Sequence, residues 1–365
     1  MAYSTITKPT DYFNTVTYQG DGTSQNEITG VGFQPDLTWV KNRDTASTPN
    51  LIVDAMRGYG TSGKTLTTND TASEASNSAT SRFVDNGAIA DGFTVGNSTY
   101  TNGSSTNYAS WNWKAGTTGS GTTTGSGTGK AYSYSVNTTA GFSIISYIGN
   151  GSAGHTIPHH LGNTPSCIIV KNRDTARNWS VYHKDSFTSQ AAPGVLYLNT
   201  TAARANDTNV WGNSSVTINS TVFSLGDYEG TNQNNDNTIA YCFAEKTGYS
   251  KFGKYIGNGD ANGPFVYTGF KPAWVLTKAI TRTGRWRVWD NKRSPINVAD
   301  ERLDPSSSDA ENTGATEAID ILSNGFKIRT SEGQFNGSGE TNIYMAFAEE
   351  PLVANVGESI PATAK

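Results

Sequence analysis

The hexapeptide Lys-Asn-Arg-Asp-Thr-Ala occurs at residues 41–46 and again, letter for letter, at residues 171–176. Each copy begins six residues after a proline, with a short apolar run between them. Residues 272–278 repeat the spacing from proline to lysine without the rest of the hexapeptide. Self-similarity of this kind indicates an internally repeated architecture, and the chain is therefore predicted to contain three related units.

The three units also begin and end alike. Each unit opens with the pattern Tyr-x-Gly-Asx-Gly, where x is any residue. Each unit closes on an aromatic residue 92 to 96 positions after this tyrosine. Units of this length hold a core of their own, unlike the short units of solenoids. The openings are residues 18–22, 147–151 and 255–259, and the closing aromatic residues are Trp113, Phe243 and Phe347.

The composition within each unit favours strands. Val, Ile, Thr, Tyr, Phe and Trp are plentiful, strong helix formers are scarce, and 39 of the 365 residues are glycine. Short apolar runs such as Leu37–Val40 and Cys167–Val170 are bounded by Gly, Asn, Asp and Pro. The sequence therefore predicts an all-β protein with three tandem β-sandwich, jelly-roll-like repeats and extended terminal arms, and it excludes an all-α fold.

The expected boundaries follow from the repeats. Residues 117–130 have the Gly/Ser/Thr composition of a flexible linker. We expect this linker and both arms to be held by contacts with other subunits, because such segments otherwise fray. The predicted segments are an N-terminal arm (1–11), repeat 1 (12–116), the linker (117–130), repeat 2 (131–249), repeat 3 (250–350) and a C-terminal arm (351–365).

The charge balance narrows the choice of partners. The chain has 27 Lys and Arg against 31 Asp and Glu, which argues against a protein that neutralises nucleic-acid phosphates. No run approaches the ~20 apolar residues of a membrane helix, and the first residues lack the pattern of a signal peptide. Cys167 and Cys242 are expected to be buried free thiols of a protein made in a reducing cytoplasm.

Several of these motifs together resemble a known family. The tyrosine openings, the Lys-Asn-Arg-Asp repeats and the stretches 111–116 and 241–252 resemble repeat-containing virion proteins of tailed bacteriophages, many of them marine or cyanobacterial. The ending at residues 357–365 is similar to theirs as well. The resemblance spans residues 12–365 and implies a place in the virion, after assembly in the host cytoplasm.

The resemblance implies a non-enzymatic structural protein, with a tail fibre or other adsorption protein that contacts the host surface as the leading expectation. A capsid decoration (cement) protein is the first alternative, and a polysaccharide depolymerase tailspike is the second. We expect a homo-oligomer, with a trimer favoured, that contacts other virion proteins through its arms and a host surface glycan. No cofactor, no nucleic acid and no membrane insertion are expected.

Residues 58–65, Gly-Tyr-Gly-Thr-Ser-Gly-Lys-Thr, match the P-loop pattern letter for letter. Phosphate binding by that motif requires a helix after the loop, and residues 66–73 have a poor helical sequence. The preceding residues 53–57 align with 289–293 of the third unit, where no such motif follows. We therefore interpret the motif as a glycine-rich surface loop, with Lys64 exposed and no nucleotide bound.

Two further groups of residues suggest chemistry at first sight. His155, His159 and His160 are of the metal-binding type, but the other units have no histidine at the aligned positions, and a structural zinc site needs four ligands. Glu245 and Glu349 recur at one place in two units, whereas glycoside hydrolysis needs two carboxylates that face each other. The sequence predicts no metal site and no catalytic residue.

The tryptophans can be sorted by recurrence. Four of them occupy recurring positions and are predicted to be buried, and two have no counterpart and are freer to serve a surface of one unit. The first group is Trp39, Trp179, Trp274 and Trp286, and the second is Trp211 and Trp289.

The last of these lies in a basic and aromatic stretch, residues 282–289. If this stretch is a strand, Trp286 and Val288 face the core, and the residues between and beside them face outward together. Guanidinium groups beside an aromatic ring suit an acidic glycan or a neighbouring subunit. The predicted partner- or glycan-binding residues are Arg285, Arg287 and Trp289.

Overall fold

The computed structural model of the protein describes residues 4–189, 193–213, 215–314 and 316–351. Nearly every regular element in these ranges is a strand, so the predicted all-β class is confirmed. The described ranges contain no helix with the length and apolar character required to cross a bilayer. The short helical turns are η1 (Pro9–Asp11), α1 (Asn77–Thr80), α2 (Thr208–Trp211), α3 (Glu229–Asn232) and α4 (Gly333–Asn336).

Each repeat contributes one large antiparallel sheet, and the three large sheets share a strand order. The strand that contains the opening tyrosine lies beside the last strand of the unit, and the next two strands of the same sheet follow. In unit 1 (residues 12–116) the order is β1 (Phe13–Gln19), β9 (Asn107–Trp113), β3 (Leu37–Asn42), β4 (Leu51–Asp54), β5 (Lys64–Thr67) and β6 (Ala75–Ser76). In unit 2 (residues 117–249) it is β10 (Thr117–Thr122), β12 (Ala131–Asn137), β13 (Phe142–Ile148), β20 (Asn237–Phe243), β15 (Cys167–Asn172), β16 (Ser180–His183), β17 (Gly194–Tyr197) and β18 (Ala205–Asn206). In unit 3 (residues 250–351) it is β21 (Ser250–Ile256), β27 (Thr341–Pro351), β23 (Phe270–Ala279) and β24 (Trp286–Asp290).

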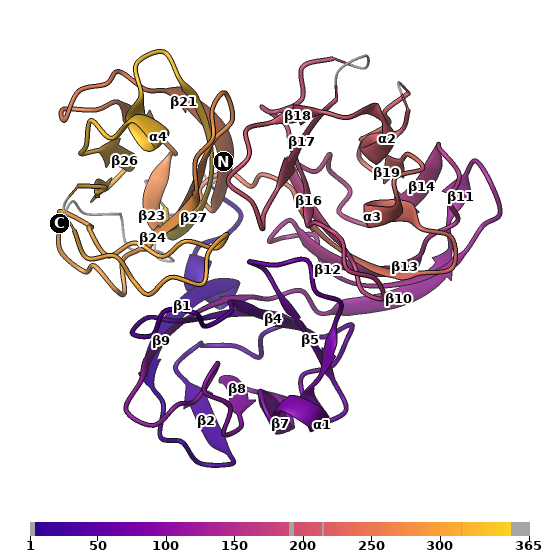
Figure 1. The fold of residues 1–365 in the computed structure, drawn as a ribbon, viewed down its shortest axis with the longest axis horizontal. Helices are drawn as coiled ribbons and strands as arrows, with labels where there is room; N and C mark the ends of the chain where they lie inside the picture. Colours follow the sequence, from indigo (N-terminus) through magenta and orange to yellow (C-terminus); the bar gives the residue numbers. More distant parts are fainter. Residues whose placement is uncertain (1–3, 190–192, 214, 315, 352–365) are drawn as a thin grey trace.

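A three-stranded sheet covers the outer side of each large sheet, with a buried apolar cluster between the two layers. Figure 1 shows the units as three lobes around a centre, with the large sheets on the inner side. The small sheets are β2 (Asn26–Thr29), β8 (Gly92–Val95) and β7 (Phe83–Ile89) in unit 1, β11 (Thr124–Gly125), β14 (His155–Pro158) and β19 (Val222–Leu225) in unit 2, and β22 (Phe265–Tyr267), β26 (Gly325–Ile328) and β25 (Ile319–Leu322) in unit 3.

The recurring tyrosine openings are explained by hydrogen bonds within each unit. In unit 3 the Tyr255 hydroxyl donates to the Phe335 carbonyl at 2.9 Å. The turn that follows is held by Asn336, whose side-chain oxygen accepts from the Asn258 amide at 3.0 Å and whose carbonyl accepts from the Gly259 amide at 2.7 Å. Gly259 has a φ of +71°, which favours glycine at this turn. The equivalent asparagines of the other units are Asn102 and Asn232.

The inner faces of the three large sheets meet in a fourth apolar cluster that is shared by all units. At its centre the closing aromatic residues form a triangle. The ring centroids are 6.2 Å apart for Trp113 and Phe243, 5.7 Å for Trp113 and Phe347, and 6.0 Å for Phe243 and Phe347. The central strands of each large sheet, β9 and β3, β20 and β15, and β27 and β23, are therefore buried on both faces. The four tryptophans predicted to be buried, Trp39, Trp179, Trp274 and Trp286, all belong to this shared core.

Buried polar contacts join neighbouring units around the shared core. In unit 1 the Asp54 carboxylate, at the end of β4, lies 2.7 Å from the Arg57 guanidinium, and both side chains are fully buried. The same carboxylate accepts a hydrogen bond of 2.6 Å from the Tyr241 hydroxyl of unit 2. A buried ion pair that also satisfies a polar group of the next unit fixes how the two units meet.

The other two junctions use the equivalent positions, and the one at Asp290 also repeats the ion pair. In unit 3 the Asp290 carboxylate lies 2.7 Å from Arg293 and accepts from the indole N–H of Trp111 in unit 1 at 3.0 Å. Unit 2 has His183 at this position, and its Nε2 lies 3.1 Å from the Tyr344 carbonyl of unit 3. The contacts run from unit 1 to unit 2, from unit 2 to unit 3 and from unit 3 to unit 1, so the three units close a ring.

One segment of each unit also lies against the next unit, and we call these segments straps 1, 2 and 3 (residues 67–76, 197–204 and 304–311). Each strap donates one backbone hydrogen bond to the residue two positions after the recurring lysine. The bonds run from Glu74 to Arg173 at 2.9 Å, from Arg204 to Ile280 at 3.0 Å and from Glu311 to Arg43 at 2.7 Å.

The repeated hexapeptide belongs to these junctions. Arg43 pairs with Glu311 of strap 3 at 2.7 Å, and Arg173 pairs with Glu74 of strap 1 at 2.8 Å. The recurrence of Lys-Asn-Arg-Asp therefore reflects contacts between units as well as the fold of each unit.

The recurring lysines, Lys41, Lys171 and Lys278, are all buried beside the straps. The Lys278 ammonium donates to the carbonyls of Thr201 in strap 2 and Gly284, at 3.2 and 2.8 Å. Burial lowers the pKa of Lys278 to about 7, and Arg287 adds to the effect. Burial likewise lowers the pKa of Lys41 and of Lys171 to about 8.

Residues 117–130 are not a linker between domains, which corrects the prediction. β10 pairs with β12, and β11 pairs with β14, so this segment extends both sheets of unit 2. Strand pairing uses backbone groups, which a Gly/Ser/Thr sequence supplies as well as any other. The segment is thus held by strand pairing within its own chain.

The described part of the N-terminal arm also packs on its own chain. Ile6 lies in the shared core, and the Ser4 hydroxyl donates to the Thr247 carbonyl at 2.8 Å. Residues 1–3 and 352–365, which include nearly all of the predicted C-terminal arm, lie outside the described residues.

Replacing Asp54 by alanine should lower the free energy of unfolding by about 3–5 kcal/mol, because it removes the carboxylate that pairs with the fully buried Arg57 guanidinium. Lys8→Ala is the control, since it breaks the exposed Lys8–Asp11 pair and should cost less than about 1 kcal/mol. Denaturant titration of the two variants measures both values. Equal losses for the two variants would show that the buried junction does not matter for stability.

The buried lysines should make the protein more stable as the pH rises from about 7 to 9. Lys278 loses its proton near pH 7 in the folded state, whereas an unfolded lysine keeps it until about pH 10, so the unfolded state binds more protons in this window. Lys278→Met should reduce the slope of unfolding free energy against pH by up to about 1.4 kcal/mol per pH unit. An unchanged slope in denaturant titrations at several pH values would contradict this assignment.

Candidate functional site

The predicted outward patch on β24 is not an exposed face, and this prediction is wrong. Trp289 is fully buried in the core between the two layers of unit 3, where its ring stacks on Phe335 at 4.7 Å. Its indole N–H donates to the Glu317 carbonyl at 3.3 Å. Trp211, the other tryptophan expected to be free for a surface, is fully buried in the core of unit 2.

The two arginines of the predicted patch are engaged by carboxylates of the same chain. Arg287 is 1% exposed and its Nε donates to Glu317 at 2.6 Å. Arg285 keeps 39% of its side chain exposed, and its guanidinium pairs with Asp304 and Asp309. Their positive charges are therefore neutralised within unit 3 and do not form a basic face.

The physical reason for this error is the burial of both faces of the large sheet. Successive side chains along β24 point to opposite faces of the sheet. Trp286 and Val288 therefore lie in the shared core, and Trp289 lies in the core of unit 3. Alternation marks an exposed face only where one side of a sheet meets water.

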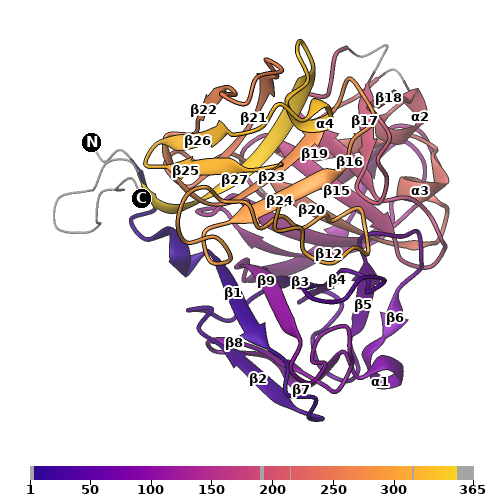
Figure 2. The ribbon, with the colours of Figure 1, turned by 60° about the vertical axis from the view of Figure 1, so that its left-hand side comes forward.

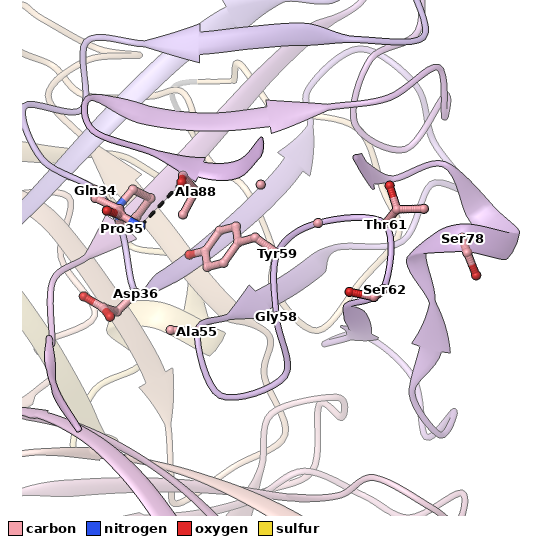
Figure 3. Close-up of a pocket in the computed structure, with 12 residues that line it drawn as sticks. Gln34, Pro35, Asp36, Ala55, Gly58, Tyr59, Thr61, Ser62, Ser78 and Ala88 are labelled. Atoms are coloured by element: carbon pink, nitrogen blue, oxygen red, sulfur yellow. Dashed lines mark hydrogen bonds between the residues drawn. The ribbon is translucent and has the colours of Figure 1, made fainter. Parts of the chain in front are cut away.

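The structure instead places an open cleft at the loop with the P-loop-like sequence. The cleft has a volume of about 800 Å³. Its walls come from the loop at residues 58–62, from the turn before β3 and from β7, as Figure 3 shows. The lining residues are Gln34, Pro35, Asp36, Ala55, Gly58, Tyr59, Gly60, Thr61, Ser62, Ser78, Gly87 and Ala88.

The glycines of this loop are explained by a tight turn rather than by phosphate binding. Gly58 has a φ of +83°. A Cβ on Gly63 would lie 2.0 Å from the Gly58 carbonyl oxygen, so the loop closes on itself only with glycine at that position. The loop is followed by strand β5, where a P-loop needs a helix. Lys64 is the half-buried first residue of β5 and does not line the cleft.

The cleft offers hydroxyl, amide and carboxylate groups. Thr61, Ser62 and Ser78 contribute hydroxyls, and the Gln34 amide donates to the Ala88 carbonyl at 3.4 Å (Figure 3). Tyr59 lies in the wall and its own hydroxyl donates to Thr38 at 3.0 Å. The described lining residues include no Lys or Arg, so the cleft suits a neutral ligand rich in hydroxyl groups better than a phosphate.

Asp36 is the one carboxylate among the described lining residues. Its oxygens accept from the Ala115 amide at 2.8 Å and from the Ser135 hydroxyl at 3.4 Å. Burial raises the pKa of the Asp36 carboxyl, and the bond from Ala115 opposes that shift. The sequence offered one signal for this residue, since only unit 1 has an acid directly after the recurring proline.

The histidines singled out from the sequence are held by hydrogen bonds and ring contacts. His155 lies between Asn232 and Thr123, at 2.9 and 2.6 Å. His159 Nε2 lies 3.0 Å from the Asn219 carbonyl, and the His160 ring stacks on Tyr134. Within the described residues no group of three or more His, Cys, Asp and Glu side chains is arranged to hold a metal ion.

The remaining candidates have structural roles. Glu245 forms ion pairs with Lys184 and Lys251 at 2.8 and 2.5 Å, and Glu349 pairs with Lys271 at 2.7 Å. The two cysteines, Cys167 and Cys242, are buried and unpaired, which confirms the prediction of free thiols. Burial raises the pKa of both thiols, so neither is suited to act as a nucleophile.

Comparison with known proteins assigns a family. Residues 8–351 match the family described as Domain of unknown function (DUF7483), and the chain belongs to that family. The match spans all three units. No curated protein and no solved structure matches the chain.

Substituting Gly63 by alanine should destabilise the protein by about 1–3 kcal/mol, because the new Cβ collides with the Gly58 carbonyl. Gly60→Ala is a matched control in the same loop, since its Cβ would meet nothing nearer than the Val84 carbonyl at 3.8 Å. Thermal unfolding of both variants measures the difference. Two equal melting temperatures would show that the loop does not depend on this close approach.

Proposed function

We propose that the chain is a non-enzymatic structural protein of a tailed-phage virion, and that it serves as a tail fibre or other adsorption protein that contacts the host surface. Its ligand in this proposal is a neutral saccharide of the host surface, bound in the cleft beside Tyr59. The observation that carries the ligand assignment is the lining of this cleft by hydroxyls, an amide and a single carboxylate.

The arrangement of the units supports an attachment role. A receptor site must keep its shape under load, and the cleft is built on a unit that is joined to both of its neighbours through buried contacts. The threefold arrangement of a fibre is supplied in this proposal by three repeats of one chain. A homotrimer, which the sequence favoured, is then not required to form it.

The cleft supports binding rather than hydrolysis. Glycoside hydrolysis uses two carboxylates on either side of the scissile bond. Among the described residues that line the cleft, Asp36 is the one that has a carboxylate. This carboxylate already accepts hydrogen bonds from Ala115 and Ser135. A depolymerase tailspike therefore ranks last among the three candidate functions.

A capsid decoration protein is the second candidate, and one observation favours it. The described ends of the chain meet at one place, where residues 7–10 and 349–351 line a common pocket. The predicted C-terminal arm begins at Pro351 in this pocket, and in this candidate function it would reach neighbouring shell subunits. In this reading the cleft of unit 1 has no ligand.

The cleft can be tested with an array of neutral and acidic oligosaccharides of the bacterial cell surface. Ser62→Trp places a large side chain at the cleft, and Ser104→Trp places the same side chain at another exposed position of unit 1. We expect the unmodified chain to bind neutral saccharides, Ser62→Trp to weaken binding by about tenfold or more, and Ser104→Trp to bind normally. Absence of saccharide binding, or equal binding by the two variants, would refute the ligand assignment.

The place in the virion needs a separate measurement. Gold-labelled antibody against the chain, viewed on phage particles by electron microscopy, should decorate the tail. Label over the whole capsid would support the decoration protein instead, and absence of label from particles would refute both candidates.

A further inference from the structure

The outer edge of the small sheet is protected differently in the three units. The equivalent strands are β2, β14 and β22, because each places one buried aliphatic residue opposite a phenylalanine of the neighbouring strand. The pairs are Ile28 with Phe93, Ile157 with Phe223, and Val266 with Phe326. The residues on either side of the aliphatic residue can therefore be compared position by position.

Two of the edges carry features that prevent pairing with another chain. In unit 1 the flanking residues are Glu27 and Thr29, both exposed, and a charge on an edge strand opposes the addition of a further strand. In unit 2 the strand β11 covers the edge, with Thr124 opposite Thr156. The other flanking residue there is Pro158, which has no N–H to donate.

The edge of unit 3 has neither form of protection. β22 is the outermost strand of its sheet, and Figure 2 shows it at the outer side of the molecule. The flanking residues are Phe265 and Tyr267, with exposed fractions of 46% and 54%. An uncovered edge strand with two exposed aromatic side chains is the form that soluble proteins avoid unless a partner covers it.

The backbone groups of these two residues point away from the sheet. Pro264 accepts from the Ile328 amide at 3.1 Å, and the Thr268 amide donates to Asn324 at 3.0 Å. Residues that bond to the neighbouring strand alternate along an antiparallel ladder, so Val266 bonds to β26 and the residues beside it do not. The N–H and C=O groups of Phe265 and Tyr267 are therefore directed outward, and no described strand pairs with that side.

We propose that β22 pairs antiparallel with β22 of a second copy of this chain, centred on Val266. Phe265 then lies opposite the partner's Tyr267, and Tyr267 lies opposite the partner's Phe265. Each of these pairs exchanges two backbone hydrogen bonds, and the aromatic side chains form cross-strand pairs on one face. The two small sheets become one six-stranded sheet with a twofold axis at its centre.

A second copy fits this edge for reasons of register. The strand is symmetric about Val266 in its hydrogen-bonding pattern, and an aromatic side chain stands on each side of it. Pairing with itself therefore brings aromatic side chains opposite each other without a charge or a gap. Unit 2 shows that this edge of the fold accepts an added antiparallel strand, since β11 occupies the equivalent position. The proposal is independent of the function proposed above.

The length of β22 determines how strong the dimer is expected to be. Three residues on each side provide few backbone bonds and a contact at the small end of protein interfaces, so the dimer should be weak and depend on concentration.

Sedimentation velocity of the full chain at about 1–200 µM tests the proposal. We expect a monomer at the low end and a dimer at the high end. Tyr267→Pro introduces the residue that unit 2 has at Pro158, removes one outward N–H from each copy and should weaken the dimer by about tenfold or more. Phe265→Glu introduces the charge that unit 1 has at Glu27, and it should do the same. Ile296→Glu changes an apolar side chain that is 75% exposed elsewhere in unit 3, and it should leave the dimer unchanged.

Each other outcome overturns the proposal. A monomer throughout the concentration range would show that no second copy binds this edge. A trimer, or a dimer that both edge variants retain, would place the interface elsewhere. The edge variants should melt at the temperature of the unmodified monomer, because both side chains are exposed, so a loss of the dimer without a loss of the fold is measurable.

Discussion

The contact among Trp113, Phe243 and Phe347 determines the architecture of the whole molecule. These residues stand at the same place in the last strand of each repeat, and their rings meet in the shared core. Each large sheet must turn one face toward this point and still bury its other face against a small sheet of its own unit. This requirement produces three lobes around one centre.

The polar junctions determine how the lobes meet. Apolar packing alone does not fix the relative orientation of two units closely. Asp54 and Asp290 each pair with a buried arginine and also accept a hydrogen bond from a side chain of a neighbouring unit. A small displacement between units would leave one of these buried groups without its partner. The hydrogen bonds of the straps, which lie beside the buried lysines, also hold neighbouring units in one relative orientation.

This use of the inner faces leaves little of the large sheets for contact with other molecules. Unit 2 differs from the others in its large sheet, which β10 and β12 extend. The two features at which binding is proposed lie on the outer side: the cleft beside Tyr59 in unit 1 and the aromatic edge of β22 in unit 3. Repetition thus builds the rigid body, and the departures from repetition are the places at which binding is proposed.

The sequence by itself determined the repeat, the all-β class and most of the core, because a residue that every unit needs must recur at the same spacing. The closing aromatic residues, the tryptophans of the shared core and the tyrosine openings were all visible in this way. The lack of a helix after the P-loop-like stretch was also visible, since Leu66 and the residues after it do not favour one, and strand β5 follows the loop.

Only the tertiary structure decided which faces are covered. Periodicity in a strand separates two faces but does not say that both are buried, and this is why Arg287 and Trp289 were assigned to a surface. Residues 117–130 were assigned to a linker because their composition says nothing about backbone pairing with β12 and β14. The cleft around Asp36 joins segments far apart in the chain, and such proximity follows from the fold rather than from any local pattern of residues.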